Sequence, residues 1–111
     1  MVDLDQRDLR RQFLSGLVRG LKVVWPILSA LIVVIVALGV IVGLREGWSL
    51  QESVYFSFVT GLTIGYGDFS PKTLIGRVLA IAIGACGILL VAVAAAVAVN
   101  ALTDIQDGEN K

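Results

Sequence analysis

The sequence predicts an all-α membrane protein, in which two membrane-spanning helices flank a short helix and loop that enter the membrane and return. Three observations predict this fold class. Apolar residues make up 57% of the 111 positions, above the ~45–50% that is usual in a soluble domain. They concentrate in two stretches without charged residues, 23–44 and 78–103. Between these stretches lies a segment with helix signals that is too short to cross a bilayer.

The composition also excludes several classes of function. The chain has no His, one Cys and zero formal net charge. It therefore holds no His-based catalytic pair and no His/Cys metal cluster, and it has no glycine-rich phosphate loop. No basic stripe indicates nucleic-acid binding. We expect neither an enzyme nor a protein with an organic cofactor.

Residues 1–22 show the periodicity of an amphipathic helix. Apolar residues recur at helical spacing on one side, namely Leu9, Phe13, Leu14, Leu17, Val18 and Leu21. Basic residues take the other side, namely Arg10, Arg11, Arg19 and Lys22. This pattern predicts a helix in the membrane interface, with its apolar face in lipid and its basic face at the headgroups. Two roles stay open: an anchor that only sets orientation, or a cuff that couples the lipid surface to the first span.

An outer membrane-spanning helix is expected over residues 23–44. These 22 uncharged positions exceed the ~20 needed to cross the hydrocarbon core. Pro26 is expected in the first turn of this helix, where proline costs little. Five basic residues precede the span, and Arg45 follows it closely. The five are Arg7, Arg10, Arg11, Arg19 and Lys22. By the positive-inside rule the amino terminus is cytoplasmic, so a multi-pass cell-membrane protein with both termini in the cytoplasm is expected.

A short re-entrant helix is expected over residues 49–61. Ser49, followed three residues later by Glu52, forms a capping-box signal for a helix start. A helix of a dozen residues covers about 18–20 Å at 1.5 Å per residue, less than the ~30 Å hydrocarbon core. It must therefore enter and return. Non-helical backbone at that depth is tolerated only when it is buried in protein or lines a water-filled path.

The returning segment, residues 63–67, carries residue types that suit ion binding. Glycines at positions 65 and 67 can adopt positive φ, which lets consecutive carbonyl groups face the same way. Such oxygens replace the hydration shell of a bare monovalent cation, and Thr63 adds a hydroxyl oxygen. Ile64 and Tyr66 are expected to point away from the ions, against the aromatic side of the short helix. That side consists of Tyr55, Phe56 and Phe58. One row of carbonyls cannot surround an ion, so the functional unit is expected to be an oligomer.

The pentapeptide Thr63-Ile64-Gly65-Tyr66-Gly67, the capped half-helix before it and the two apolar stretches around it resemble one known family. They are similar to the pore domain of prokaryotic potassium channels with two membrane helices per subunit, over residues 24–103. The resemblance implies a homotetramer, surrounded by membrane lipid, that conducts K⁺. It also implies a selectivity filter in which K⁺ binds to Thr63, Ile64, Gly65, Tyr66 and Gly67. Potassium ions are then the bound species and no cofactor is expected.

Three residues are expected to support this filter. Asp68 either enriches cations at the outer mouth, accepts a hydrogen bond from Tyr55 that locks the loop, or is a solvated carboxylate. In some two-helix potassium channels, a Glu four residues before the filter Thr pairs with this Asp. Val59 occupies that position here, so the resemblance does not carry the filter-inactivation behaviour of those channels to this chain.

An inner membrane-spanning helix is expected over residues 73–103, followed by a short polar cytoplasmic tail, 104–111. Small residues along it allow close helix approach. The resemblance places Gly87 at a gating hinge, although packing against the first span explains this glycine equally well. It places the cavity-facing and cytoplasmic-crossing positions on the same helix: Ile88, Val91 and Ala95 at the cavity, and Val99 and Thr103 at the crossing.

Other functions stay open beside a potassium-selective channel. A poorly selective monovalent cation channel is the nearest alternative. A single repeat-like unit of a potassium uptake transporter and a non-conducting membrane scaffold belong to other classes. The sequence indicates neither a regulatory partner nor a gating stimulus.

Overall fold

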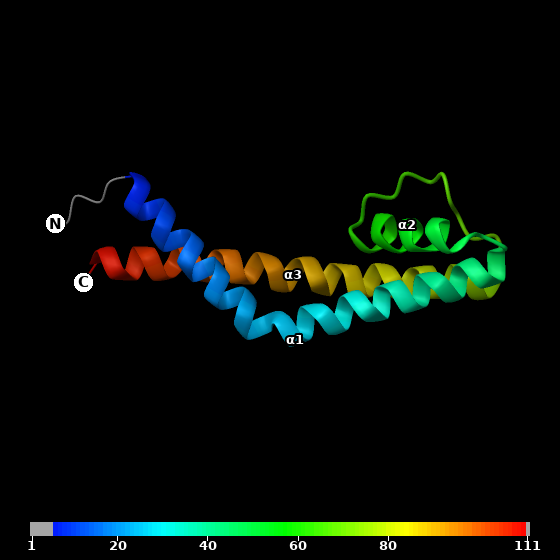
Figure 1. Cartoon of the computed structure of the whole chain (residues 1–111), viewed down its shortest axis with the longest axis horizontal. Coiled ribbons are helices and arrows are strands. Elements are labelled where there is room, and N and C mark those ends of the chain that lie inside the picture. Colours follow the sequence, from blue (N-terminus) through cyan, green and yellow to red (C-terminus); the bar gives the residue numbers. More distant parts are fainter. Residues whose placement is uncertain (1–5, 111) are drawn as a thin grey trace. The chain divides into compact units, whose positions relative to one another are not determined.

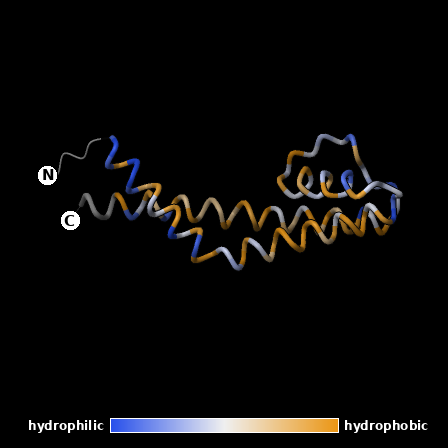
Figure 2. Tube along the Cα trace, in the orientation of Figure 1, coloured by the Kyte–Doolittle hydropathy of each residue, from blue (hydrophilic) through white to orange (hydrophobic). Residues whose placement is uncertain are grey.

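The computed structural model describes residues 6–110, and the side chains of residues 6–105. Three helices make up this part of the chain: α1 (Gln6–Glu46), α2 (Leu50–Gly61) and α3 (Leu74–Asn110) (Figure 1). Residues Gln6–Glu46 and Leu74–Ile105 are each long and apolar enough to cross a membrane. Figure 2 shows the apolar residues along both helices. The predicted class, all-α with two membrane-length helices, is confirmed.

The first helix, α1, is longer than predicted. It runs without interruption from Gln6 to Glu46 and includes Pro26 in its interior, so the prediction that Pro26 lies in a first turn is wrong. Proline removes one N–H donor, and membrane helices tolerate this loss when neighbouring groups satisfy the freed carbonyl. No helix boundary marks the expected division between residues 22 and 23. Residues 1–5 of the predicted segment 1–22 lie outside the described residues.

The short helix α2 begins as its sequence predicts. The Glu52 amide donates to the Ser49 hydroxyl (3.1 Å) and the Ser49 amide donates to the Glu52 carboxylate (2.8 Å), so the capping box is confirmed. Gly47, at φ 77°, makes the turn from α1, because this left-handed conformation costs glycine little.

The described residues group into two compact units. The central unit is residues 27–91, and the described part of the terminal unit is residues 6–26 with 92–110. In the central unit a core of Ile35, Val42, Phe56 and Ile83 joins α1, α2 and α3. The contact of α1 with α2 depends on small residues. A β-carbon on Gly39 would overlap the Ser57 hydroxyl, and one on Gly43 would overlap that of Ser53.

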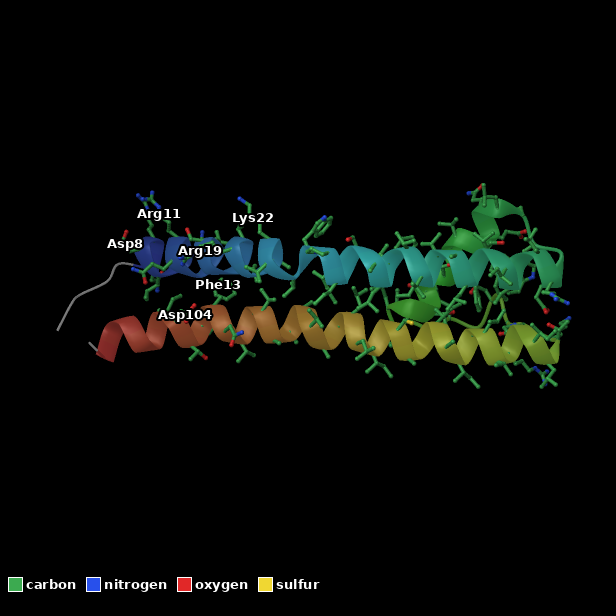
Figure 3. The ribbon with its side chains drawn as sticks, turned by 90° about the horizontal axis from the view of Figure 1, so that it is seen from below. Asp8, Arg11, Phe13, Arg19, Lys22 and Asp104 are labelled. Atoms are coloured by element: carbon green, nitrogen blue, oxygen red, sulfur yellow. The ribbon has the colours of Figure 1, made fainter. Side chains whose placement is uncertain are left out.

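In the terminal unit, the amino-terminal part of α1 packs against the carboxyl-terminal part of α3. A β-carbon on Gly16 would lie 3.2 Å from Ala101 Cβ, and one on Gly20 would lie 2.7 Å from Val97 Cγ1. Phe13 lies between the two helices, and Arg11 and Lys22 project from the opposite side of α1 (Figure 3). Part of the apolar side of α1 is thus directed to α3, because Gly16 and Gly20 let the helix backbones approach closely. Leu14 and Val18, which belong to the same side, are each 49% exposed.

The last helix, α3, also exceeds its predicted length. Thr73 caps its start, because its hydroxyl accepts a hydrogen bond from the Gly76 amide (3.0 Å). The helix continues past Thr103 to Asn110, through most of the segment that was expected as a polar tail. Lys111 lies outside the described residues.

Candidate functional site

The loop after α2 is tied to the end of that helix by its own backbone. The amides of Ile64 (2.9 Å) and Gly65 (3.2 Å) both donate to the Val59 carbonyl oxygen, and the Thr63 amide donates to Thr60 (3.1 Å). The described residues contain no cis peptide bond. In a planar trans peptide the carbonyl of one residue points opposite to the amide of the next. The carbonyls of Thr63 and Ile64 therefore point away from Val59 and the end of α2.

Three residues of the loop have positive φ. Gly65 (φ 62°) and Gly67 (φ 82°) adopt the conformation that the sequence predicts for them. Thr63 (φ 61°) also does so, and this was not predicted, because a left-handed threonine is uncommon. Its hydroxyl donates to the Leu62 carbonyl (2.6 Å). The backbone thus has positive φ at every second residue from Thr63 to Gly67. This alternation lets consecutive carbonyl groups face the same way.

All five residues of the segment 63–67 are exposed in the single chain. Tyr66 is 70% exposed, rather than enclosed against the aromatic side of α2 as expected. Phe69 packs there instead, with ring centroids 5.4 Å from Trp48 and 5.9 Å from Tyr55. Trp48 also packs on Phe56 (5.0 Å), a contact that no local sequence pattern indicates. The loop turns at Gly67, which brings Phe69 back to α2 and leaves Tyr66 outside.

Two predicted support residues are joined directly. The Tyr55 hydroxyl donates to Asp68 Oδ2 (2.9 Å), and the Phe69 amide donates to Asp68 Oδ1 (3.2 Å). Sequence analysis left three interpretations of Asp68 open. The hydrogen bond from Tyr55 that one of them predicts is present. Val59 is 8% exposed, and its apolar side chain offers no partner to Asp68. It contacts the loop through its carbonyl oxygen.

Glu46 holds the far end of the same loop, and sequence reasoning missed it. Its carboxylate accepts hydrogen bonds from the Lys72 amide (2.7 Å), the Thr73 hydroxyl (2.5 Å) and the Thr73 amide (3.2 Å). The Thr73 hydroxyl and then the Lys72 amide hold the pKa of Glu46 below its ordinary value of 4.5. Glu46 follows the uncharged stretch of α1. An acid at such a place in a sequence usually indicates a carboxylate exposed to water. Its pairing depends on contacts 26 residues apart, which no local pattern reveals.

Gly87 is buried in the central unit. A β-carbon there would overlap the backbone carbonyl of Gly61 at the end of α2. The contact that needs a glycine is thus made with α2, and not with the first span as the packing interpretation expected. The predicted cavity and crossing residues are all exposed in the single chain, namely Ile88, Val91, Ala95, Val99 and Thr103.

Two membrane-length helices are joined by a capped short helix and a glycine-containing loop, in which the carbonyls of Thr63 and Ile64 point away from that helix. This arrangement defines a class of pore-forming membrane protein. Residues 27–104 match the family whose description is "Ion channel". The chain belongs to this family. Its membrane location follows from that membership and from the two apolar helices.

Several known proteins are similar to this chain. "Probable potassium channel protein 2" of Methanocaldococcus jannaschii is 40% identical over 50 residues, which are 45% of this chain and 15% of that protein. "Potassium channel subfamily K member 4" of Mus musculus is 36% identical over 56 residues, 50% of this chain and 14% of that protein. "TWiK family of potassium channels protein 9" of Caenorhabditis elegans is 44% identical over 43 residues, 39% of this chain and 8% of that protein. The chain thus spans at most 15% of these three relatives. No solved structure matches it significantly.

Proposed function

We propose that the chain forms a homotetrameric, potassium-selective channel, in which K⁺ passes down its gradient between the oxygens of Thr63, Ile64, Gly65, Tyr66 and Gly67. One observation carries this proposal. The Val59 carbonyl oxygen accepts hydrogen bonds from the amides of Ile64 and Gly65. The carbonyls of Thr63 and Ile64 are therefore turned to the uncovered side of the loop. Such carbonyls replace the water around a dehydrated ion.

Several copies are needed to complete the site. A single loop supplies oxygens from one side only, and cyclic symmetry brings identical loops around one axis. Tyr66 is largely exposed in one chain, and an adjacent copy would cover it in the tetramer. The helix α2 directs its carboxyl-terminal end, with about −0.5 charge, toward the loop, which favours a cation at that depth.

The names of the relatives support potassium as the conducted ion. The three reported above are each named as potassium channels, and no observation favours a poorly selective channel, a transporter unit or a scaffold. Passive conduction makes and breaks no bonds, so the protein is no enzyme. The excess of basic residues before the first span supports cytoplasmic termini in the cell membrane.

The remaining pore residues are proposed on the inner helix. Ile88, Val91 and Ala95 would line the water-filled cavity, and Val99 and Thr103 would lie at the cytoplasmic crossing. Their exposure in one chain leaves them available to such a cavity. Gly87 would act as a hinge, in addition to its contact with Gly61.

Potassium flux into vesicles tests this function. The purified chain, reconstituted alone, should take up K⁺ down its gradient, and barium should block this uptake. Gly67→Ala is the matched variant, because alanine at φ 82° strains the loop without changing charge, and it should abolish flux. Absence of barium-sensitive flux in the wild type would contradict the proposal and favour a scaffold.

A further inference from the structure

An apolar cavity lies in the central unit, beside the carboxyl-terminal end of α2. Its volume is about 120 Å³. Residues from α1, from α2 and its C-cap, and from α3 line it, namely Ile32, Ile35, Phe58, Gly61, Leu62 and Leu90. The lining includes none of residues 63–67, so the cavity is separate from the proposed ion-binding site.

The inner wall of this cavity offers little to a polar molecule. Among the residues that line it, all within the described part of the chain, only Ser57 has a polar side chain. Ser57 is buried, and its hydroxyl already donates to the Ser53 carbonyl (2.8 Å). A water molecule is held in a cavity only when several polar groups bind it. The chemistry of the wall therefore favours an apolar occupant.

The size of the cavity limits what that occupant can be. An apolar cavity of about 150 Å³ lined by Leu, Ile and Phe stays dry and binds benzene or xenon. The present cavity has the same residue types in its wall and a similar volume, about 120 Å³. Phe58 and Leu62 are exposed and form its rim, so a molecule can enter without unfolding the core.

We propose that this cavity binds one small, uncharged, apolar molecule of the size of benzene or a short haloalkane, which enters it from the hydrocarbon of the membrane. Such molecules leave water for hydrocarbon, and α1 and α3 are both long and apolar enough to lie there. A phospholipid acyl chain is too long for the cavity, and a charged group would find no partner in its wall.

A bound molecule would connect two elements of the central unit. It contacts Leu62, directly before residues 63–67, and Leu90 of α3. Because it binds the folded protein, it stabilises the packing of α2 on α3. This site goes beyond the proposed function, and it does not depend on which ion the channel conducts.

Fluorine NMR of fluorobenzene tests the site without any flux measurement. The purified oligomer in detergent is titrated with fluorobenzene, and protein-free micelles give the contribution of fluorobenzene dissolved in detergent. We expect an additional, saturable component with the protein. Leu90→Trp fills the cavity and should weaken this binding by about ten-fold or more. Leu89→Trp is the matched control, because Leu89 is exposed and does not line the cavity, and it should bind as the wild type does.

Two further measurements keep the proposal falsifiable if Leu90→Trp folds poorly. Leu90→Ala enlarges the cavity, so it should bind 1-fluoronaphthalene, which the wild type should exclude. Fluorobenzene should also raise the unfolding temperature of the wild type and of Leu89→Trp, but not that of Leu90→Trp.

Three results would overturn the proposal. The first is purely linear uptake of fluorobenzene by the wild-type oligomer, as in protein-free micelles, because an adjacent copy would then cover the cavity. The second is equal binding by Leu90→Trp and Leu89→Trp. The third is loss of the saturable component on adding phospholipid, because an acyl chain would then fill the cavity. None of these results bears on potassium flux, so the site and the proposed function can fail separately.

Discussion

Gly87 of α3 lies directly against the backbone carbonyl of Gly61, at the point where α2 ends and the loop to residues 63–67 begins. A β-carbon on Gly87 would overlap that carbonyl oxygen. The backbone of Gly61 cannot rotate aside as a side chain can. The position of α3 is therefore linked to the start of this loop through one glycine.

Gly87→Ala should destabilise the protein by about 3 kcal/mol, at the upper end of what overpacking costs. The control is Gly84→Ala, because a β-carbon on Gly84 meets no atom within 4 Å. Alanine is the better helix former by about 1 kcal/mol, so this control should be neutral or slightly stabilising. Thermal unfolding in detergent compares the two variants. Equal unfolding temperatures would contradict the packing role.

The hinge prediction is separate, and unchanged opening and closing kinetics in Gly87→Ala would contradict it.

Gly39→Ala should separate α1 from α2. The added methyl group would overlap the Ser57 hydroxyl, which costs about 1–3 kcal/mol when a packed contact must shift. A second change, Ser57→Gly, removes the overlapping atoms and should restore part of the loss. Measuring unfolding temperatures for both single variants and the double variant checks this. If the double variant is no more stable than Gly39→Ala alone, the contact is not the cause.

Tyr55 and Asp68 should show a coupled effect on the filter. Tyr55→Phe removes the hydroxyl that donates to Asp68 (2.9 Å), and Asp68→Asn weakens the acceptor. This hydrogen bond is exposed, so water competes for both of its groups. Each single variant should speed the decline of current during sustained conduction, and the double variant should resemble either one. Strictly additive effects of the two changes would show that the residues act independently.

Glu46→Gln should loosen the loop after the filter, because the carboxylate accepts three hydrogen bonds from Lys72 and Thr73. The pKa of Glu46 is lowered in the folded protein, so its contribution to stability is complete above the ordinary value of 4.5. That contribution is lost as the pH falls through the lowered folded value. The wild type should unfold at a higher temperature than Glu46→Gln at neutral pH, and the difference should vanish in strong acid. A difference that is constant over this pH range would contradict the assignment.

The sequence predicted the elements that local chemistry determines. The capping box at Ser49 and Glu52 depends on residues three positions apart, and it is present. Positive φ at Gly65 and Gly67 follows from the lack of a side chain, and it is also present. Uncharged length indicated the two membrane helices, since a hydrocarbon core of ~30 Å sets that length.

The missed features depend on contacts between distant residues. A proline at position 26 indicates a helix start, yet α1 continues through it although proline has no N–H donor. The apolar side of residues 6–22 suits lipid and a second helix equally well. Gly16 and Gly20 bring α3 against part of it, and Leu14 and Val18 stay exposed. Phe69 and Glu46 meet their partners only after the chain has returned from the loop. Tyr66 is exposed in the single chain, and in the proposed tetramer its packing would depend on other copies, which the periodicity of one sequence does not describe.

Bi-ionic reversal potentials test the central claim most directly. The purified chain is placed in a planar bilayer with K⁺ on one side and Na⁺ on the other, at equal concentration. If main-chain oxygens of residues 63–67 replace the hydration shell of K⁺, the reversal potential should be large and of the sign set by potassium permeability. A reversal potential near zero, reflecting equal permeability of the two ions, would contradict it.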